Sequence, residues 1–140
     1  MLFRSLTRDV DAAVAREDLP RIIKAAGESG LAYRHAAGVD MLIDANTTGP
    51  ARSAIHLIFT NEKVRAEYAE PVPASQPDTT NEGIQIAPVA DLVKMKLTSF
   101  RLKDQVHIQD LDSVGLITPE IESTLPPLFQ ERLAKIRASE

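Results

Sequence analysis

Two aspartates near the start of the chain, Asp9 and Asp11, have the spacing that metal chemistry needs. They lie in a segment, Phe3 to Ala15, that is predicted to be a strand, and alternate side chains of a strand point to opposite faces. The two carboxylates would therefore share one face, while the apolar residues of the segment hold the other face against a core. Mg²⁺ favours a few carboxylate oxygens together with substrate phosphates, so this face could hold the ion beside a triphosphate. Aspartate pairs are also frequent at strand ends and in turns, so a structural role is the alternative.

A second set of charged residues lies on the apolar sides of two predicted helices. The helix that begins at Pro88 has an apolar stripe with Lys96 near its centre. The next helix, from Lys103 to Val114, has Asp110 among its apolar residues and His107 close by. One interpretation is a functional site, and the other is a buried ion pair between Lys96 and Asp110 that joins the two helices. The stripe residues are Val89, Leu92, Val93, Leu97 and Phe100 in the first helix and Val106, Leu111 and Val114 in the second.

The three histidines are weaker candidates for a site. His56 falls within the clearest strand, Arg52 to Thr60, whose two faces are both largely apolar, and a hydrogen-bonded core histidine is expected there. His35 and His107 lack the spacing of a metal site, so both are expected at the surface or behind a site.

These residues are positioned by a strand, a helix, further strands and a helical C-terminal third. Arg16 to Gly30 is predicted to be helical, with Asp18 and Pro20 at its start and Gly30 at its end. The order indicates a single α/β or α+β domain over residues 1–140, with a mixed sheet covered mainly on one face. The other expected segments are an extended region over Tyr33 to Ile43, a hairpin loop over Asp44 to Pro50, a central strand over Arg52 to Thr60, an irregular region over Asn61 to Glu82, a short strand over Gly83 to Ala87, and helices that begin at Pro88, at Lys103, at Thr118 and after Pro126-Pro127.

Composition sets the class of protein but favours no partner. The 140 residues carry a formal net charge of −4, which gives no general attraction to nucleic acid or to an anionic membrane. The chain has no cysteine, so disulfides, thiolate zinc sites and cysteine nucleophiles are excluded. No stretch has the roughly 20 apolar residues of a membrane span, and charged residues interrupt the first segment where a signal peptide would be apolar. A cytoplasmic location is expected.

Taken together, the motifs resemble the nucleotidyltransferase-like superfamily. Thr7-x-Asp9-Val10-Asp11 is followed by a helix, by a central strand with a polar group inside it, by Val89-x-x-Leu92-Val93-x-Met95-Lys96-Leu97 and by Asp110-Leu111. The closest likeness is to the small bacterial branch that includes the nucleotidyltransferase toxins of toxin–antitoxin systems. The resemblance covers roughly residues 4 to 114 and implies a minimal nucleotidyltransferase-like mixed sheet with helices.

The resemblance implies transfer of a nucleoside monophosphate from a nucleoside triphosphate to a hydroxyl or phosphate acceptor. Metal ions bridge the phosphates in such chemistry and stabilise the attacking and leaving oxygens. Carried over to this chain, Asp9 and Asp11 would bind Mg²⁺, and Thr7 would shape the turn beside the phosphates. Lys96 would contact a triphosphate oxygen, and Asp110 would orient Lys96 or bind the acceptor.

Two departures from the family pattern count against full activity. The family has a Gly-Gly or Gly-Ser phosphate loop shortly before the Asp pair, whereas only residues 1–6 precede Thr7 here. A third carboxylate of the family would fall at about His56, and a neutral imidazole is a poor ligand for a hard ion that prefers oxygen. The chain is expected to be an N-terminally shortened relative, a relative that no longer performs the chemistry, or one whose natural start lies upstream of Met1.

Two functions therefore stand as expectations. The first is a degenerate nucleotidyltransferase-fold protein with weak or no metal-dependent transfer. The second is a non-catalytic interaction module, either a subunit of a homo-oligomer or a toxin–antitoxin-type partner, in which another chain covers an open sheet edge or an apolar face.

Overall fold

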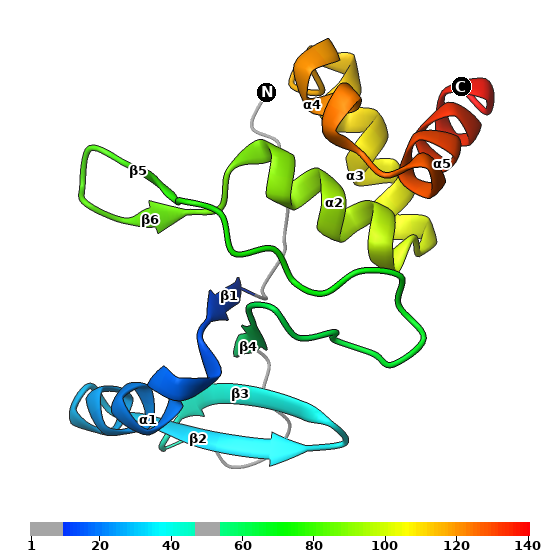
Figure 1. The fold of residues 1–140 in the computed structure, drawn as a ribbon. Coiled ribbons are helices and arrows are strands. Elements are labelled where there is room, and N and C mark those ends of the chain that lie inside the picture. Colours follow the sequence, from blue (N-terminus) through cyan, green and yellow to red (C-terminus); the bar gives the residue numbers. More distant parts are fainter. Residues whose placement is uncertain (1–9, 47–53) are drawn as a thin grey trace. The chain divides into compact units, whose positions relative to one another are not determined.

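The computed structural model describes residues 10–46 and 54–140. The chain divides into two compact units, residues 1–64 and residues 65–140 (Figure 1). The strand predicted over residues 3–15 is thus described from Val10 onward, and the loop predicted over residues 44–50 is described as far as Asn46.

A four-stranded mixed sheet forms the first unit, in the order β1-β4-β3-β2. β1 pairs parallel with β4, whereas β3 pairs antiparallel with both β4 and β2. The inner position of β4 confirms the central strand predicted from the sequence, and the mixed sheet combined with helices confirms the α+β class. The elements of this unit are β1 (Val10–Val14), a 3₁₀ turn (Arg16–Asp18), α1 (Leu19–Glu28), β2 (Leu31–Ala36), β3 (Val39–Asp44) and β4 (Ile55–Phe59).

Helix α1 covers one face of this sheet because its apolar residues recur on successive turns. Ile22 and Ala26 of the helix belong to the same core cluster as Leu57 and Phe59 of β4. The helix ends, as predicted, just before Gly30, whose φ of +81° is a conformation that glycine adopts without steric cost.

The predicted extended region over residues 33–43 is a β-hairpin made of β2 and β3. Ala37 and Gly38 join the two strands, with φ angles of +52° and +74°. Two successive residues with positive φ form the type I′ turn whose twist matches that of the flanking strands. Asparagine or glycine is usual at the first position, so Ala37 hides the turn from sequence inspection.

Four helices and a short β-hairpin form the second unit. The core of this unit lies between α2, α3 and α5, where Val93, Leu97, Ile108, Phe129 and Leu133 are buried. The elements are β5 (Asp78–Thr79), β6 (Gln85–Ile86), α2 (Val89–Ser99), α3 (Leu102–Ser113), α4 (Pro119–Thr124) and α5 (Pro127–Ala138). The predicted helix starts are confirmed to within two residues, and β5 is a short strand within the region predicted to be irregular.

The apolar face predicted for α3 is confirmed at Leu111, which packs against the core, and is wrong at its other two residues. Val106 and Val114, which were expected to face the core, are 52% and 70% exposed. The residues of α3 that are fully buried are Asp104 and Ile108 instead. These positions lie one turn apart and next to Leu111, so the buried side of α3 is rotated by about 100° around the helix from the side that the apolar pattern indicates.

Candidate functional site

Asp11, the described member of the aspartate pair, lies beside His56. The two residues are partners in the register of the parallel strands β1 and β4, so their side chains share one face of the sheet. The Asp11 Oδ1 atom is 3.6 Å from the His56 Nδ1 atom, and the two side chains are 59% and 35% exposed. Ala12 and Val14 belong to the core cluster on the opposite face, as the alternation predicted. Thr7 and Asp9 lie outside the described residues.

The described residues do not by themselves form a Mg²⁺ site. Within residues 10–46 and 54–140, no group of three or more histidine, cysteine, aspartate or glutamate side chains could hold a metal ion. Asp11 and His56 supply one carboxylate and one imidazole, and Mg²⁺ prefers oxygen ligands. His56 is half-buried and faces a carboxylate, so it is not the enclosed core histidine that the sequence suggested.

A second polar cluster lies on the opposite face of the sheet and was missed from the sequence. The nearly buried Asp40 of β3 accepts hydrogen bonds from the Tyr33 hydroxyl and from His35 Nδ1, the latter at 2.9 Å. Burial alone would raise the pKa of Asp40, but these two hydrogen bonds lower it below its usual value. The hydrogen bond to Asp40, together with burial, raises the pKa of Tyr33. The alternation of Tyr33 and His35 along β2, read with a turn at Gly38, was the available signal.

Arg16 forms a further contact at the end of the two parallel strands. Its guanidinium is bound by both carboxylate oxygens of Glu62, at 3.1 and 2.9 Å, and lies 3.6 Å from the centre of the Phe59 ring. The hydrogen bond from Arg16 lowers the pKa of Glu62. This pair closes the segment that follows β1 onto the segment that follows β4.

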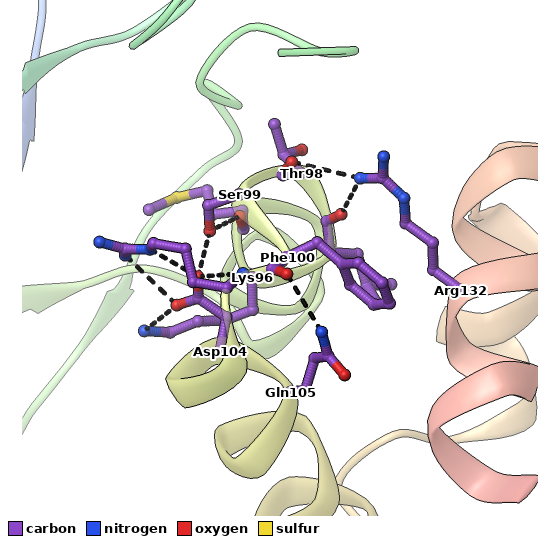
Figure 2. Close-up of polar contacts among 10 residues, drawn as sticks. Lys96, Thr98, Ser99, Phe100, Asp104, Gln105 and Arg132 are labelled. Atoms are coloured by element: carbon purple, nitrogen blue, oxygen red, sulfur yellow. Dashed lines mark hydrogen bonds and ion pairs between the residues drawn. The ribbon is translucent and has the colours of Figure 1, made fainter. Parts of the chain in front are cut away.

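Lys96 has a partner on the next helix, but the partner is Asp104. The Lys96 Nζ atom is 3.4 Å from Asp104 Oδ1, and Figure 2 marks this contact. The lysine side chain is 22% exposed. The predicted ion pair between consecutive helices is present, but its predicted partner, Asp110, is wrong. Asp110 is exposed, and Asp104 pairs with Lys96 instead. The anomaly that the sequence shows at Lys96 is thus explained by a carboxylate two turns earlier in α3.

Asp104 is a fully buried carboxylate that organises the junction between α2 and α3. It accepts hydrogen bonds from Ser99 Oγ at 2.7 Å, from the Arg101 N–H at 3.0 Å and from Arg101 Nε at 2.8 Å (Figure 2). Burial by itself would raise the pKa of Asp104, but the donors of Arg101 and Ser99 lower it to about 2. An acidic residue in the first turn of a helix was the signal in the sequence.

The same junction contains a residue in an uncommon backbone conformation. Phe100 ends α2 in the left-handed region, with φ +49° and ψ +32°. Arg132 of α5 donates hydrogen bonds to the carbonyl oxygens of Leu97 and Thr98 and lies 4.9 Å from the centre of the Phe100 ring (Figure 2). A cation at the carboxyl end of a helix satisfies carbonyl groups that the helix leaves free.

Asp110 and His107 lie in a groove between α2 and α3. The groove has a volume of about 440 Å³ and is lined by Leu92, Lys96, His107, Asp110, Leu111 and Val114. Three of the six lining residues are apolar, and Lys96 is already paired with Asp104. The two residues predicted to act together, Lys96 and Asp110, therefore share a groove without forming an ion pair with each other in the described structure.

Comparisons place no further constraint on the site. No helix in the described part of the chain is sufficiently long and apolar to cross a membrane. The whole chain matches no model of a protein family, no curated protein and no solved structure. Membership of the nucleotidyltransferase-like superfamily is therefore a hypothesis that rests on the motifs of the chain itself.

Proposed function

We propose that this chain is a degenerate nucleotidyltransferase-fold protein of the cytoplasm, with weak or no metal-dependent transfer of a nucleoside monophosphate from a nucleoside triphosphate. The pair Asp11 and His56 carries the proposal. Asp11 occupies one position of the Asp-x-Asp motif, and His56 is its direct neighbour on the central parallel strand, where the family pattern has a third carboxylate. On this proposal, His56 occupies the position of the family's third carboxylate, but its imidazole is a poor ligand for Mg²⁺.

The other motif residues have reduced roles in this proposal. Lys96 would contact a triphosphate only by leaving Asp104, which is fully buried and would lose one of its cations. Asp110 is exposed in the groove and is free to bind an acceptor. A lysine held by a carboxylate neutralises less phosphate charge, so we expect Lys96 to contribute to weak nucleotide binding more than to efficient transfer.

Calorimetric titration with Mg²⁺ and nucleoside triphosphates tests this proposal. We expect weak binding by the wild type and still weaker binding by Asp9→Asn and by Asp11→Asn, because each variant removes one carboxylate charge. No heat from the wild type, or identical heat from the wild type and both variants, would remove the metal-site part of the proposal.

A gain-of-function variant gives a sharper test. His56→Asp supplies the oxygen ligand that the family pattern has at this position, so we expect tighter Mg²⁺ binding, by roughly tenfold or more. His56→Asn is the matched control, because it has a similar size and an oxygen atom but no charge. Equal Mg²⁺ affinities for His56→Asp and His56→Asn would contradict the assignment of this position.

The second candidate function is the non-catalytic interaction module. One observation favours it: α3 exposes large apolar side chains at Leu102, Val106 and Val114, which are 81%, 52% and 70% exposed. A row of this kind on one helix is typical of a surface that another molecule covers. Light scattering on the purified protein tests this candidate, since a monodisperse monomer with no co-purifying partner would contradict it.

A further inference from the structure

The outward side of α3 combines apolar residues with two unpaired opposite charges. Leu102, Lys103, Val106, Asp110 and Val114 project within about 120° of helical arc, on the side away from the buried Asp104 and Ile108. In the described structure, neither the Lys103 ammonium nor the Asp110 carboxylate has a hydrogen-bond or ion-pair partner. The unpaired cation lies at the start of the helix and the unpaired anion near its end.

The two halves of α3 also differ in shape. The first half presents a ridge, because Leu102 and Val106 stand out from the surface. The second half lines the groove against α2 with Leu111 and Val114, and Leu92 lines it from α2. Lys103 and Asp110 lie on one side of α3 at opposite ends, so their charges are complementary to those of a second copy that runs antiparallel.

We propose that α3 forms a two-fold symmetric homodimer in which the two α3 helices pack antiparallel. With Lys103 opposite the partner's Asp110, helical spacing puts Val106 next to the partner's Val106, close to the two-fold axis. The two-fold axis repeats each contact, so both unpaired charges on each chain gain a partner. Antiparallel packing also aligns the helix dipoles favourably.

A second copy fits this surface better than an unrelated acidic or basic partner. A partner of one charge sign would pair one of the two unpaired residues and repel the other. A copy of α3 supplies both signs in the reverse order. The contact involves one helix from each chain, so we expect a reversible dimer that dissociates on the order of micromolar concentration.

Sedimentation velocity over a roughly hundredfold range of protein concentration tests this homodimer. Lys103→Glu and Asp110→Lys each place like charges in contact, so each should raise the dissociation constant by roughly tenfold or more. The double variant Lys103→Glu/Asp110→Lys restores opposite charges and should return the constant to within about threefold of the wild type. Lys24→Glu is the control, because Lys24 is an exposed lysine of α1, and it should leave the constant unchanged.

The reversals should not unfold the protein. Lys103→Glu puts an anion in the first turn of α3 and Asp110→Lys puts a cation near its end, and both changes suit the helix dipole. Circular dichroism of each variant checks this expectation. The proposed homodimer would be overturned if the wild type stayed monomeric over the whole range of protein concentration. It would also be overturned if the charge reversals left the dissociation constant of the dimer unchanged.

The homodimer rests on the second candidate function, the interaction module, and the two can fail separately. A chain that does not self-associate but co-purifies with a different protein would overturn the homodimer and would still support the interaction module. A monomer that elutes alone would overturn both. The nucleotidyltransferase proposal is carried by Asp11 and His56, which lie outside the dimer contact, so neither result tests that pair; a homodimer would occupy only Asp110 among the residues of that proposal.

Discussion

Asp11 in the first unit and Asp104 in the second unit are carboxylates in opposite situations. Asp104 is fully buried and receives donors from Ser99, Arg101 and Lys96. Asp11 is mostly exposed, and its one ion-pair neighbour among the described residues is His56 at 3.6 Å. A carboxylate whose oxygens are occupied by the protein stabilises the fold, whereas one whose oxygens are open is available to a ligand.

Asp40 lies between these extremes. It is nearly buried and accepts bonds from Tyr33 and His35, but His35 is itself more than half exposed. The number of donors that these carboxylates receive thus falls from Asp104 through Asp40 to Asp11. We expect the cost of removing each one in unfolding free energy to follow the same order.

The largest effect should come from Asp104→Asn. Loss of the charge should lower the free energy of unfolding by about 2 kcal/mol near neutral pH, because the folded pKa of about 2 lies below the unfolded value of 3.8. A group with a lowered pKa stabilises the fold above its unfolded pKa and loses that contribution as the pH falls through its folded pKa. Urea unfolding at several pH values should therefore show the difference from wild type constant above about pH 5 and shrinking toward pH 2.

The matched control for this variant is Asp110→Asn. Asp110 is exposed, so the change should alter the free energy of unfolding by less than about 0.5 kcal/mol, measured at low protein concentration. If Asp110→Asn destabilised the protein as much as Asp104→Asn, the assignment of Asp104 as the partner of Lys96 would be wrong.

Arg132→Gln should have the next largest effect. The arginine bonds to the carbonyl oxygens of Leu97 and Thr98 and covers the Phe100 ring, so its loss should cost about 1 to 2 kcal/mol of unfolding free energy. Arg132→Lys keeps the charge but not the planar group, and we expect an intermediate loss in thermal unfolding. An unchanged melting temperature for Arg132→Gln would show that Asp104 alone organises the junction.

Tyr33→Phe should cost about 1 kcal/mol, because it removes one donor of Asp40. The raised pKa of Tyr33 means that its contribution is present below pH 10 and is lost as the pH rises through its folded pKa. The protein has two tyrosines, so ultraviolet titration of wild type and variant isolates the ionisation of Tyr33. Ionisation of Tyr33 at its ordinary pKa would contradict the described hydrogen bond.

Asp11→Asn should have the smallest effect on stability, within about 0.5 kcal/mol, since the side chain is exposed. Any larger role of Asp11 should appear in Mg²⁺ and nucleotide binding instead. Chemical unfolding measures the effect of Asp11→Asn on stability, and calorimetric titration measures its effect on Mg²⁺ and nucleotide binding. Strong destabilisation by Asp11→Asn would place this residue with Asp104 and remove the contrast between them.

Periodicity in the sequence predicts the parts of this fold that depend on local pattern. The alternation around Leu57 identified the central strand, and the Thr118 cap identified the start of α4. The partial burial of Lys96 was also predictable, because a lysine in the middle of an apolar stripe needs a partner. In each of these cases, the structural feature is caused by residues that are close together in the sequence.

The partner of Lys96 could not be predicted in the same way. The chain reverses at Phe100 in a left-handed conformation, and this turn brings the first turn of α3 beside the last turn of α2. A helical wheel drawn for α3 alone favours Val106 and Val114 as its inner side, because it contains no information on that turn. The Tyr33 and Asp40 contact was hidden for a similar reason, since Ala37 is not a typical residue for its hairpin turn.

The order of strands in the sheet has a consequence for how the first unit folds. β2 and β3 are adjacent in the chain and can pair through a two-residue turn, whereas β1 pairs with β4 across the whole α1 and hairpin segment. Closing a long loop costs more entropy than closing a short one, so the hairpin should form early and β1 should join late. The strand that carries Asp11 is made before the other strands of its sheet, and we expect it to acquire its neighbour His56 last.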